Sequence, residues 1–359
     1  MIVEPKVRGF MCTTAHPEGC KAAVREQIDY INSMPKTDGP KKVLVIGASM
    51  GYGLASRIAL TYSCDADTIG VIFDKAGKEK RTGTAGWYNT VAFEEFATKD
   101  GHYAKTINGD AFSDDIKKET IDLIKKDFGK VDMVIYSVAA PRRKAPDGEI
   151  NATVKVMGGE DWRLWIDAMK EADVLSDNAV TVAYSYIGPV LTHPIYFDGS
   201  IGKAKADLYK TADEIDEQVD GVSAYVSVNK AVVTQSSAAI PIVPLYLSIL
   251  LKVMKEKNVH EECIQQMYRL VHDRLCNPSG VPVDDKRLIR MDDYEMESEV
   301  QQEVEKIWNG ITPENLTEVA DIDEYWKEFY EIFGFKIDGV DYGMDCDIQV
   351  QIPSLDSAE

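Results

Sequence analysis

Short apolar runs alternate with amphipathic stretches through the first part of the chain. Apolar runs of strand length occupy 43–46, 68–73, 102–107 and 131–137. Between them, apolar residues recur every three or four positions, which is the spacing of one helix face, over 53–62, 89–99 and 114–128. Because strands that alternate with helices form parallel sheets covered on both faces, the pattern predicts an α/β fold with a doubly wound parallel sheet.

The alternation continues after residue 179. We expect a strand at 179–185, a helix from 200 to about 219, a strand at 224–228 and a long helix from 244 to about 275. The chain then turns acidic, with short helices predicted at 295–308 and 322–333. Without an internal repeat or a low-complexity linker, the simplest organisation is one elaborated domain over 1–359. Its parts are a dinucleotide-binding core at 43–140, a catalytic and substrate-binding part at 179–275 and a C-terminal cover at 276–359.

The charge of the chain argues against polyanionic partners. It carries 60 Asp and Glu against 40 Lys and Arg, a formal net charge of -20. Nonspecific binding to nucleic acid or to an anionic membrane needs clustered cations, so neither partner is expected. A small-molecule substrate fits this composition better.

Cysteine usage and the apolar segments indicate a cytoplasmic protein. The six cysteines lack CxxC spacing, so we expect reduced thiols and neither a disulfide framework nor a metal site. The N-terminus lacks the pattern of an export signal. The most apolar stretch, 238–251, is too short to span a bilayer and contains two prolines. We interpret it as a buried strand end and helix start, and a hydrophobic wall for an acyl chain is the alternative.

The segment VLVIGASMGYGLASRIAL places three glycines between a predicted strand and a predicted helix. Gly47, Gly51 and Gly53 give the spacing GxxxGxG. Glycines let the backbone turn tightly and approach a diphosphate, while the free N–H groups at the helix start face its negative charge. The loop therefore predicts a Rossmann-type dinucleotide site that includes Gly47, Ala48, Ser49, Met50, Gly51 and Tyr52.

The same residues match a second motif. Gly47 to Gly51 also reads as GxSxG, the nucleophile elbow of α/β-hydrolases, with Ser49 as the nucleophile. That motif needs several strands before it and a histidine after a final strand, and only one clear strand precedes Ser49. A hydrolase is kept as a remote alternative.

Polar and small residues follow the next predicted strands, at the sheet edge where a cofactor lies. Phe73 and Asp74 end the second strand, and an acidic side chain there accepts hydrogen bonds from the adenosine ribose and repels a 2′-phosphate. NADH is therefore expected over NADPH. The following strands end in Asp110-Ala111 and Val138-Ala139.

Short-chain reductases with such a sheet carry Tyr-x3-Lys on one helix, and none of the 17 tyrosines here has a lysine four positions later. Instead, Tyr196 precedes Lys203 by seven residues and Lys205 by nine. Ser200 is a good N-cap for a helix that carries both lysines, which leaves Tyr196 in the preceding loop. A phenol there can approach a ligand while a lysine amine reaches the cofactor.

With these residues in place, the chain resembles the trans-2-enoyl-CoA reductases, which share a family with the V-type enoyl-acyl-carrier-protein reductases. Tyr196 and Lys205 fit the Tyr-x8-Lys mark of that family. The resemblance covers almost the whole chain. Further stretches that carry it are VRGFMCTTAHPEGC, GTAGWYN, NGDAFSD, VKVMGGEDW, AYSYIGP, GSIGKAK, VSVNKAVVTQSSAAIP and PLYLSILLKVMKEK.

The resemblance implies NADH-dependent reduction of a trans-2-enoyl-CoA in acyl-chain metabolism, by a monomer. It implies that Tyr196 is the active-site acid, that Lys205 contacts the cofactor and that Tyr186 contacts the acyl thioester. It also implies cofactor contacts at the glycine loop, the strand ends above and Val232, Val233 and Thr234.

One departure and two alternatives remain open. Relatives carry a longer segment where 146–153 joins APRRK to VKVMGGEDW, so a substrate loop is either trimmed or missing here. The nearest alternative substrate is an enoyl-acyl-carrier protein, for which the basic run 142–144 is a candidate contact. A catalytically inactive NADH sensor is a further alternative, and the presence of Tyr196 and Lys205 argues against it.

Overall fold

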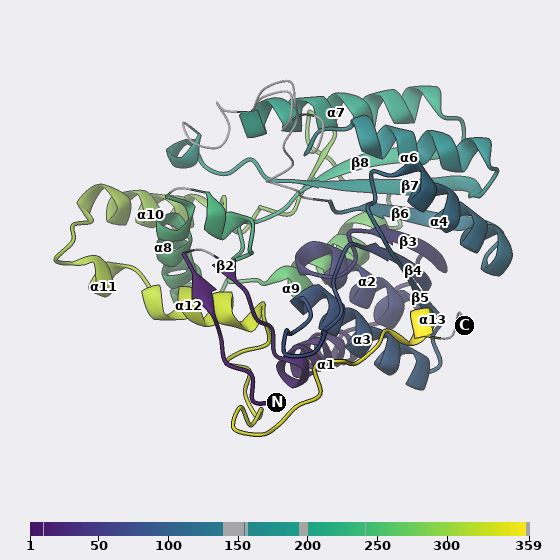
Figure 1. The fold of residues 1–359 in the computed structure, drawn as a ribbon. Coiled ribbons are helices and arrows are strands. Elements are labelled where there is room, and N and C mark those ends of the chain that lie inside the picture. The colour runs from purple at the N-terminus through teal and green to yellow at the C-terminus, as the bar shows by residue number, and fades with distance from the viewer. Residues whose placement is uncertain (10, 139–153, 155–156, 194–199, 241, 357–359) are drawn as a thin grey trace.

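A seven-stranded sheet organises the protein (Figure 1). The computed structural model describes residues 1–9, 11–138, 154, 157–193, 200–240 and 242–356. The strand order is β5-β4-β3-β6-β7-β8-β9, and every neighbouring pair is parallel. The strands are β3 (Lys42–Ile46), β4 (Asp67–Ile72), β5 (Ala104–Asn108), β6 (Val131–Tyr136), β7 (Leu175–Ser185), β8 (Val222–Val228) and β9 (Leu288–Arg290). This order confirms the predicted doubly wound, Rossmann-type fold.

Helices cover both faces of the sheet (Figure 1). One layer holds α1 (Pro17–Ser33), α2 (Gly51–Cys64), α3 (Ala85–Lys99) and α9 (Cys263–Arg269), and the other holds α4 (Asp114–Asp127), α6 (Glu160–Glu171) and α7 (Ser200–Gln218). Separate apolar clusters fill the two layers. Beside the sheet lie α8 (Val243–Glu256), α10 (Ser298–Gly310), α11 (Leu316–Val319) and α12 (Ile322–Glu331).

Local sequence explains how these helices form. In α4, the Ser113 side chain caps the N-terminus by accepting a hydrogen bond from the Ile116 N–H, and acidic first-turn and basic last-turn residues complement the helix dipole. In α6, Trp162, Trp165 and Ile166 recur at helical spacing and are fully buried against the sheet. The apolar stripe therefore fixes which face of α6 packs inward.

The prediction of one long helix over 244–275 is wrong. α8 ends at Glu256, and Asn258 takes a left-handed conformation with φ 58°, which a continuing helix cannot contain. The chain restarts at α9, where Glu262 and Gln265 form a capping box. A π-helical turn, η3 (Leu270–Leu275), follows. The predicted strand end near 238 is also wrong, because Ser237–Ala239 forms a 3-10 turn (η2).

The C-terminal part adds structure that the sequence did not predict. β9 pairs with β8 and closes one edge of the sheet. A strap at 346–354 then crosses to the opposite side of the sheet. There the Tyr88 hydroxyl donates to the Ile348 carbonyl at 2.8 Å. The buried Glu94 carboxylate accepts from the Ser354 N–H at 2.9 Å and from the Ser354 hydroxyl at 2.8 Å. The strap ends in α13 (Pro353–Asp356).

A small hairpin, β1 (Val7–Arg8) with β2 (Met11–Cys12), lies near the N-terminus. Among the helices described, none has the length and apolarity needed to cross a membrane.

Candidate active site

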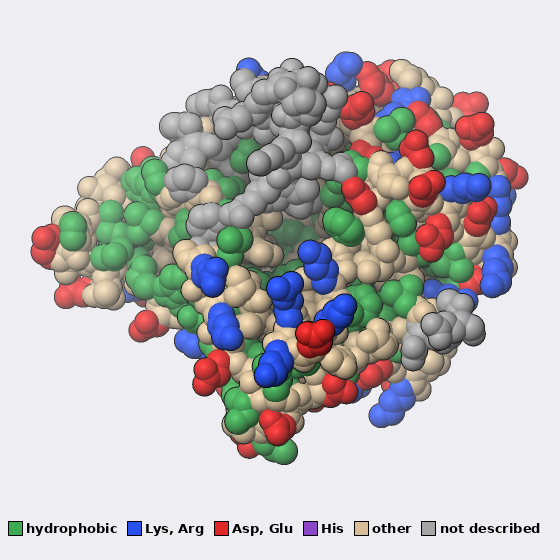
Figure 2. All heavy atoms as spheres, in the orientation of Figure 1, with side chains coloured by type: hydrophobic (Ala, Val, Ile, Leu, Met, Phe, Trp, Pro, Cys, Tyr) green, Lys and Arg blue, Asp and Glu red, His purple; other side chains and the backbone are tan. Residues whose placement is uncertain are grey.

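A cavity of about 1720 Å³ opens where the parallel strands end at their carboxyl termini. Figure 2 shows this face hollowed beside the residues drawn in grey. Doubly wound sheets bind their ligands at this edge. Six wall residues directly follow or end successive strands: Gly47, Phe73, Gly109, Ser137, Ser185 and Asn229.

The glycine loop forms one wall of the cavity. Gly47 has φ 84°, and a Cβ there would lie 2.1 Å from the Ser137 carbonyl oxygen. A Cβ on Gly53 would lie 1.9 Å from the Gly47 carbonyl oxygen, so backbone packs against backbone at both positions. Gly51, with φ 52°, borders open space at the start of α2. The Met50 side chain makes no capping hydrogen bond, so the first N–H groups of α2 are available for an anion.

Asp74 lies at the end of β4, where an adenosine ribose is expected. Its carboxylate accepts a hydrogen bond from Thr84 Oγ1 at 2.7 Å and one from the Ser49 hydroxyl. Burial raises the pKa of Asp74, and these two hydrogen bonds counteract part of that rise. The neighbouring Phe73 side chain is 74% exposed on the cavity wall, which leaves an aromatic face for a ligand ring.

The structure brings most of the predicted cofactor residues to the same cavity. The wall includes Ser49, Met50, Tyr52, Asp110, Ala111, Val138, Val232, Val233 and Thr234. Ala48 is an exception, because it is fully buried in the core and does not line the cavity. Ala139 and Tyr196 lie outside the described residues, as do the junction at 146–153 and the basic run at 142–144.

Lys205 projects from α7 into the cavity. Its side chain donates from Nζ to the Tyr184 carbonyl at 3.0 Å, near the end of β7. The residue is only 9% exposed, and burial lowers its pKa from 10.5 to about 8. The ammonium is therefore still charged at neutral pH but poorly solvated, which prepares it to bind an oxygen-rich ligand.

Tyr186 lies just after β7 and meets an acidic residue that the sequence analysis missed. Its hydroxyl donates to Glu295 Oε1 at 3.0 Å. Glu295 is fully buried, and burial raises its pKa against the effect of its hydrogen bonds. In the sequence it stands in an acidic segment, where nothing distinguishes it from a solvated carboxylate.

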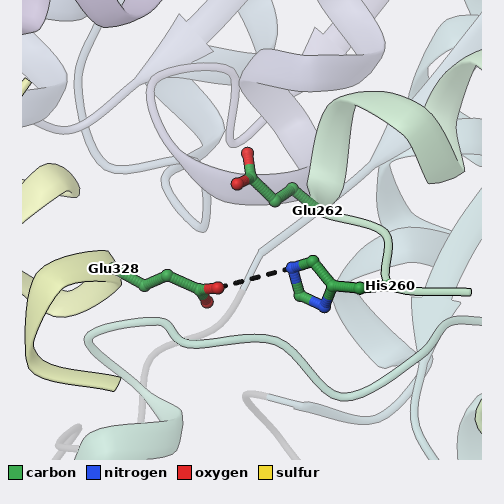
Figure 3. Close-up of side chains that lie close together, drawn as sticks. All are labelled: His260, Glu262 and Glu328. Atoms are coloured by element: carbon green, nitrogen blue, oxygen red, sulfur yellow. Dashed lines mark ion pairs between the residues drawn. The ribbon is translucent and has the colours of Figure 1, made fainter. Parts of the chain in front are cut away.

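His260, Glu262 and Glu328 lie close together on another part of the cavity wall (Figure 3). Their ligand atoms lie within 4.8 Å of one another, so among the described residues this set has the spacing to hold a divalent cation. However, Glu328 Oε1 already lies 3.4 Å from His260 Nε2 and 3.5 Å from Lys255 Nζ. We therefore interpret the cluster as an ion-pair network that joins α8 and α12 to the segment before α9.

Three family models match the chain. They describe the NAD(P)H binding domain of trans-2-enoyl-CoA reductase over 2–79, the trans-2-enoyl-CoA reductase catalytic region over 81–149 and 144–276, and an enoyl reductase FAD binding domain over 283–346. The two pieces of the catalytic region overlap at 144–149, beside the junction at 146–153 that the sequence predicts to be shorter than in relatives.

Individual relatives agree with the family models. A trans-2-enoyl-CoA reductase (NADH) of Ruminiclostridium cellulolyticum is 52% identical over 99% of this chain and 100% of the relative. An enoyl-acyl-carrier-protein reductase (NADH) of Saccharophagus degradans is 52% identical over 96% of this chain and 98% of the relative. A Clostridium trans-2-enoyl-CoA reductase in complex with NADH superposes with a TM-score of 0.94 at 44% identity, covering 98% of this chain and 99% of that one. The Treponema denticola trans-2-enoyl-CoA reductase in complex with NAD superposes with a TM-score of 0.91 at 41% identity. The superposition covers 96% of this chain and 98% of that one.

The C-terminal segment does not fit a flavin dinucleotide. Of its described residues, those on the cavity wall are Trp308, Glu324, Lys327, Glu328, Glu331, Ile332, Ile337 and Asp338. Four carboxylates against one lysine repel a diphosphate, whereas the glycine loop suits one. We therefore assign the dinucleotide site to the glycine loop and derive no step through a flavin.

Proposed function

Because the chain belongs to the trans-2-enoyl-CoA reductase family, we propose that it uses NADH to reduce a trans-2-enoyl-CoA to the saturated acyl-CoA. The observation that carries the proposal is the convergence of the glycine loop, Lys205 and Tyr186 on one cavity. When bound, NADH supplies the hydride that adds to the β-carbon of the thioester.

The residues that would hold NADH follow the cavity wall. The α2 N-terminus would bind the diphosphate, Asp74 would accept from the adenosine ribose and Phe73 would face the adenine. The remaining proposed contacts are Gly47, Ala48, Ser49, Met50, Gly51, Tyr52, Asp110, Ala111, Val138, Ala139, Lys205, Val232, Val233 and Thr234. Among these, the burial of Ala48 limits it to a backbone contact.

Addition of hydride to the β-carbon places negative charge on the thioester oxygen, and this enolate is the state that the protein must stabilise. We assign the donated hydrogen bond to the Tyr196 hydroxyl, and protonation of the α-carbon completes the reduction. Tyr186 already donates its single hydroxyl proton to Glu295, so its role is to contact and align the thioester. The Lys205 ammonium would hold the nicotinamide ribose and favour the electron-rich intermediate near Tyr196.

An enoyl-acyl-carrier protein is the second candidate substrate. One relative of each kind is 52% identical to this chain, so identity alone does not separate the two. A carrier protein is a large acidic partner and would need a basic surface beside the cavity, for which 142–144 is the proposed segment. CoA phosphates could use the same charges.

The proposal extends to the organisation and location of the protein. We propose that the chain is one domain, with a cofactor-binding core at 43–140, a catalytic part at 179–275 and a C-terminal cover at 276–359, and that it acts as a monomer. The six cysteines are all free thiols, which supports a reducing cytoplasm. The hydrolase alternative lacks support, because the chain belongs to a reductase family.

The deciding test is NADH oxidation with crotonyl-CoA, with crotonyl-acyl-carrier protein and with NADPH in place of NADH. We expect NADH-dependent turnover of the CoA ester, and Tyr196→Phe should lower kcat by roughly 100-fold or more while NADH still binds. Tyr103→Phe is a matched control, because Tyr103 pairs with Asp127 away from the cavity. Faster turnover of the carrier thioester would select the second candidate, and NADH binding without turnover would support a sensor.

A further inference from the structure

Glu295 joins three segments of the active site through one buried carboxylate. Its Oε1 accepts from Tyr186 Oη at 3.0 Å and from Tyr246 Oη at 2.7 Å. Its Oε2 accepts from the Ala231 N–H at 2.7 Å. These donors come from the end of β7, from α8 and from the segment after β8, so the carboxylate connects parts of the fold that are far apart in sequence.

The backbone of Ala231 is held at both its N–H and its carbonyl. Glu295 accepts from its N–H, and Lys230 Nζ donates to its carbonyl at 2.7 Å. Both side chains are almost fully buried, and the carboxylate and the ammonium partly offset each other's charge in this dry environment. Ala231 directly precedes Val232, the first residue of the segment 232–234 that we propose contacts the cofactor.

We infer that Glu295 is a positioning residue, which fixes the hydroxyl of Tyr186 on the thioester side relative to the Ala231 N–H on the cofactor side. The inference rests on the proposed reductase function. A reductase must hold its acceptor carbon and its hydride donor in a fixed relation, because small misplacements cost large factors in rate. One carboxylate with a partner on each side provides that relation directly.

The charge state and the two oxygens of Glu295 are both needed for this arrangement. A glutamine at 295 offers one acceptor oxygen and one NH2 group. The Ala231 N–H cannot turn to accept a hydrogen bond, so the amide oxygen must face it and the NH2 must face Tyr186 and Tyr246. The Tyr186 oxygen can then accept from the NH2, but its hydroxyl proton loses the carboxylate that gave it a fixed direction.

A double-mutant cycle tests the inference in the crotonyl-CoA assay. Glu295→Gln should lower kcat/KM by about 10-fold or more in the wild-type background, and by less than about 3-fold when Tyr186→Phe is already present. Most of the loss should be in kcat, with the NADH dissociation constant from fluorescence titration changed less than about 3-fold. Equal losses in the two backgrounds, or no loss in either, would overturn the inference.

Controls separate positioning from general destabilisation. Glu94→Gln changes another fully buried carboxylate, which binds Ser354 away from the cavity, and should lower the melting temperature with kcat/KM unchanged. If Glu295→Gln fails to bind NADH, the same cycle is run with Glu295→Asp, which keeps the charge and shortens the reach. Turnover by the wild-type protein tests the proposed reductase function separately. If the wild-type protein does not reduce crotonyl-CoA, the proposed function is wrong. If it does, the double-mutant cycle alone decides the role of Glu295.

Discussion

Replacing Lys205 with methionine should stabilise the protein without ligand while removing a group that the reaction needs. The pKa of Lys205 falls from its ordinary 10.5 to about 8 because the ammonium is buried. One pKa unit corresponds to about 1.4 kcal/mol, so a charged Lys205 destabilises the folded state by about 3 kcal/mol at neutral pH. Methionine removes that cost, leaves the Tyr184 carbonyl without its donor at a cost of about 1 kcal/mol, and should therefore stabilise by about 2 kcal/mol.

The sign of the pH dependence is fixed by the same pKa. Between pH 8 and pH 10.5 the unfolded chain keeps a proton on Lys205 that the folded chain has released, so wild-type stability at this site rises with pH across that window. The advantage of the methionine variant should therefore be full below about pH 7 and should shrink by about 2 kcal/mol by pH 9.5.

Urea unfolding followed by tryptophan fluorescence, at pH 7 and at pH 9.5, measures both effects. NADH titration of the same samples should show weaker binding by the variant, and turnover of crotonyl-CoA should be largely lost. Lys203→Met is a matched control on the same helix. A methionine variant less stable than wild type at pH 7, or an advantage that does not change with pH, would refute the reasoning about the buried ammonium.

Three further changes test other parts of the structure. Asp74→Ala should raise kcat/KM with NADPH relative to NADH by roughly 10-fold or more, because the carboxylate that repels a 2′-phosphate is gone, and unchanged selectivity would contradict that role. Gly53→Ala places a methyl group 1.9 Å from the Gly47 carbonyl oxygen and should abolish NADH binding in a fluorescence titration, so retained affinity would show that the loop can move. Asp161→Ala leaves the Lys117 ammonium, 2.7 Å away, buried without its carboxylate and should cost about 3 to 5 kcal/mol in urea unfolding, and a change below about 1 kcal/mol would mean that solvent reaches the lysine.

The parallel sheet was predictable because its strands are continuous apolar runs in the sequence. The runs that form β3, β4 and β6 differ clearly from the flanking sequence, and the ends of these strands were predicted to within about one residue. β9 was missed because three residues carry too short a pattern, and only pairing with β8 makes them a strand. α1 and α6 were not predicted, although a proline marks the start of α1 and tryptophans recur at helical spacing in α6.

The residues of the candidate site were predictable only where they directly follow a predicted strand. Gly47 and Asp74 could be placed because the carboxyl ends of parallel strands meet at one edge. Glu295 could not, because its importance depends on burial and on donors that lie 49 to 109 residues away in sequence. The helix break near Asn258 was missed for a related reason, since asparagine tolerates both helical and left-handed backbone.

The strap at 346–354 has a consequence for how the protein is made. Glu94 and Tyr88 belong to the cofactor-binding half, yet their partners Ser354 and Ile348 are synthesised 260 residues later. A ribosome that has just completed the glycine loop and α3 therefore holds a nascent half-domain whose buried carboxylate has not yet met its donors. This half should remain open to chaperones and proteases until residues 346–354 have emerged from the ribosome.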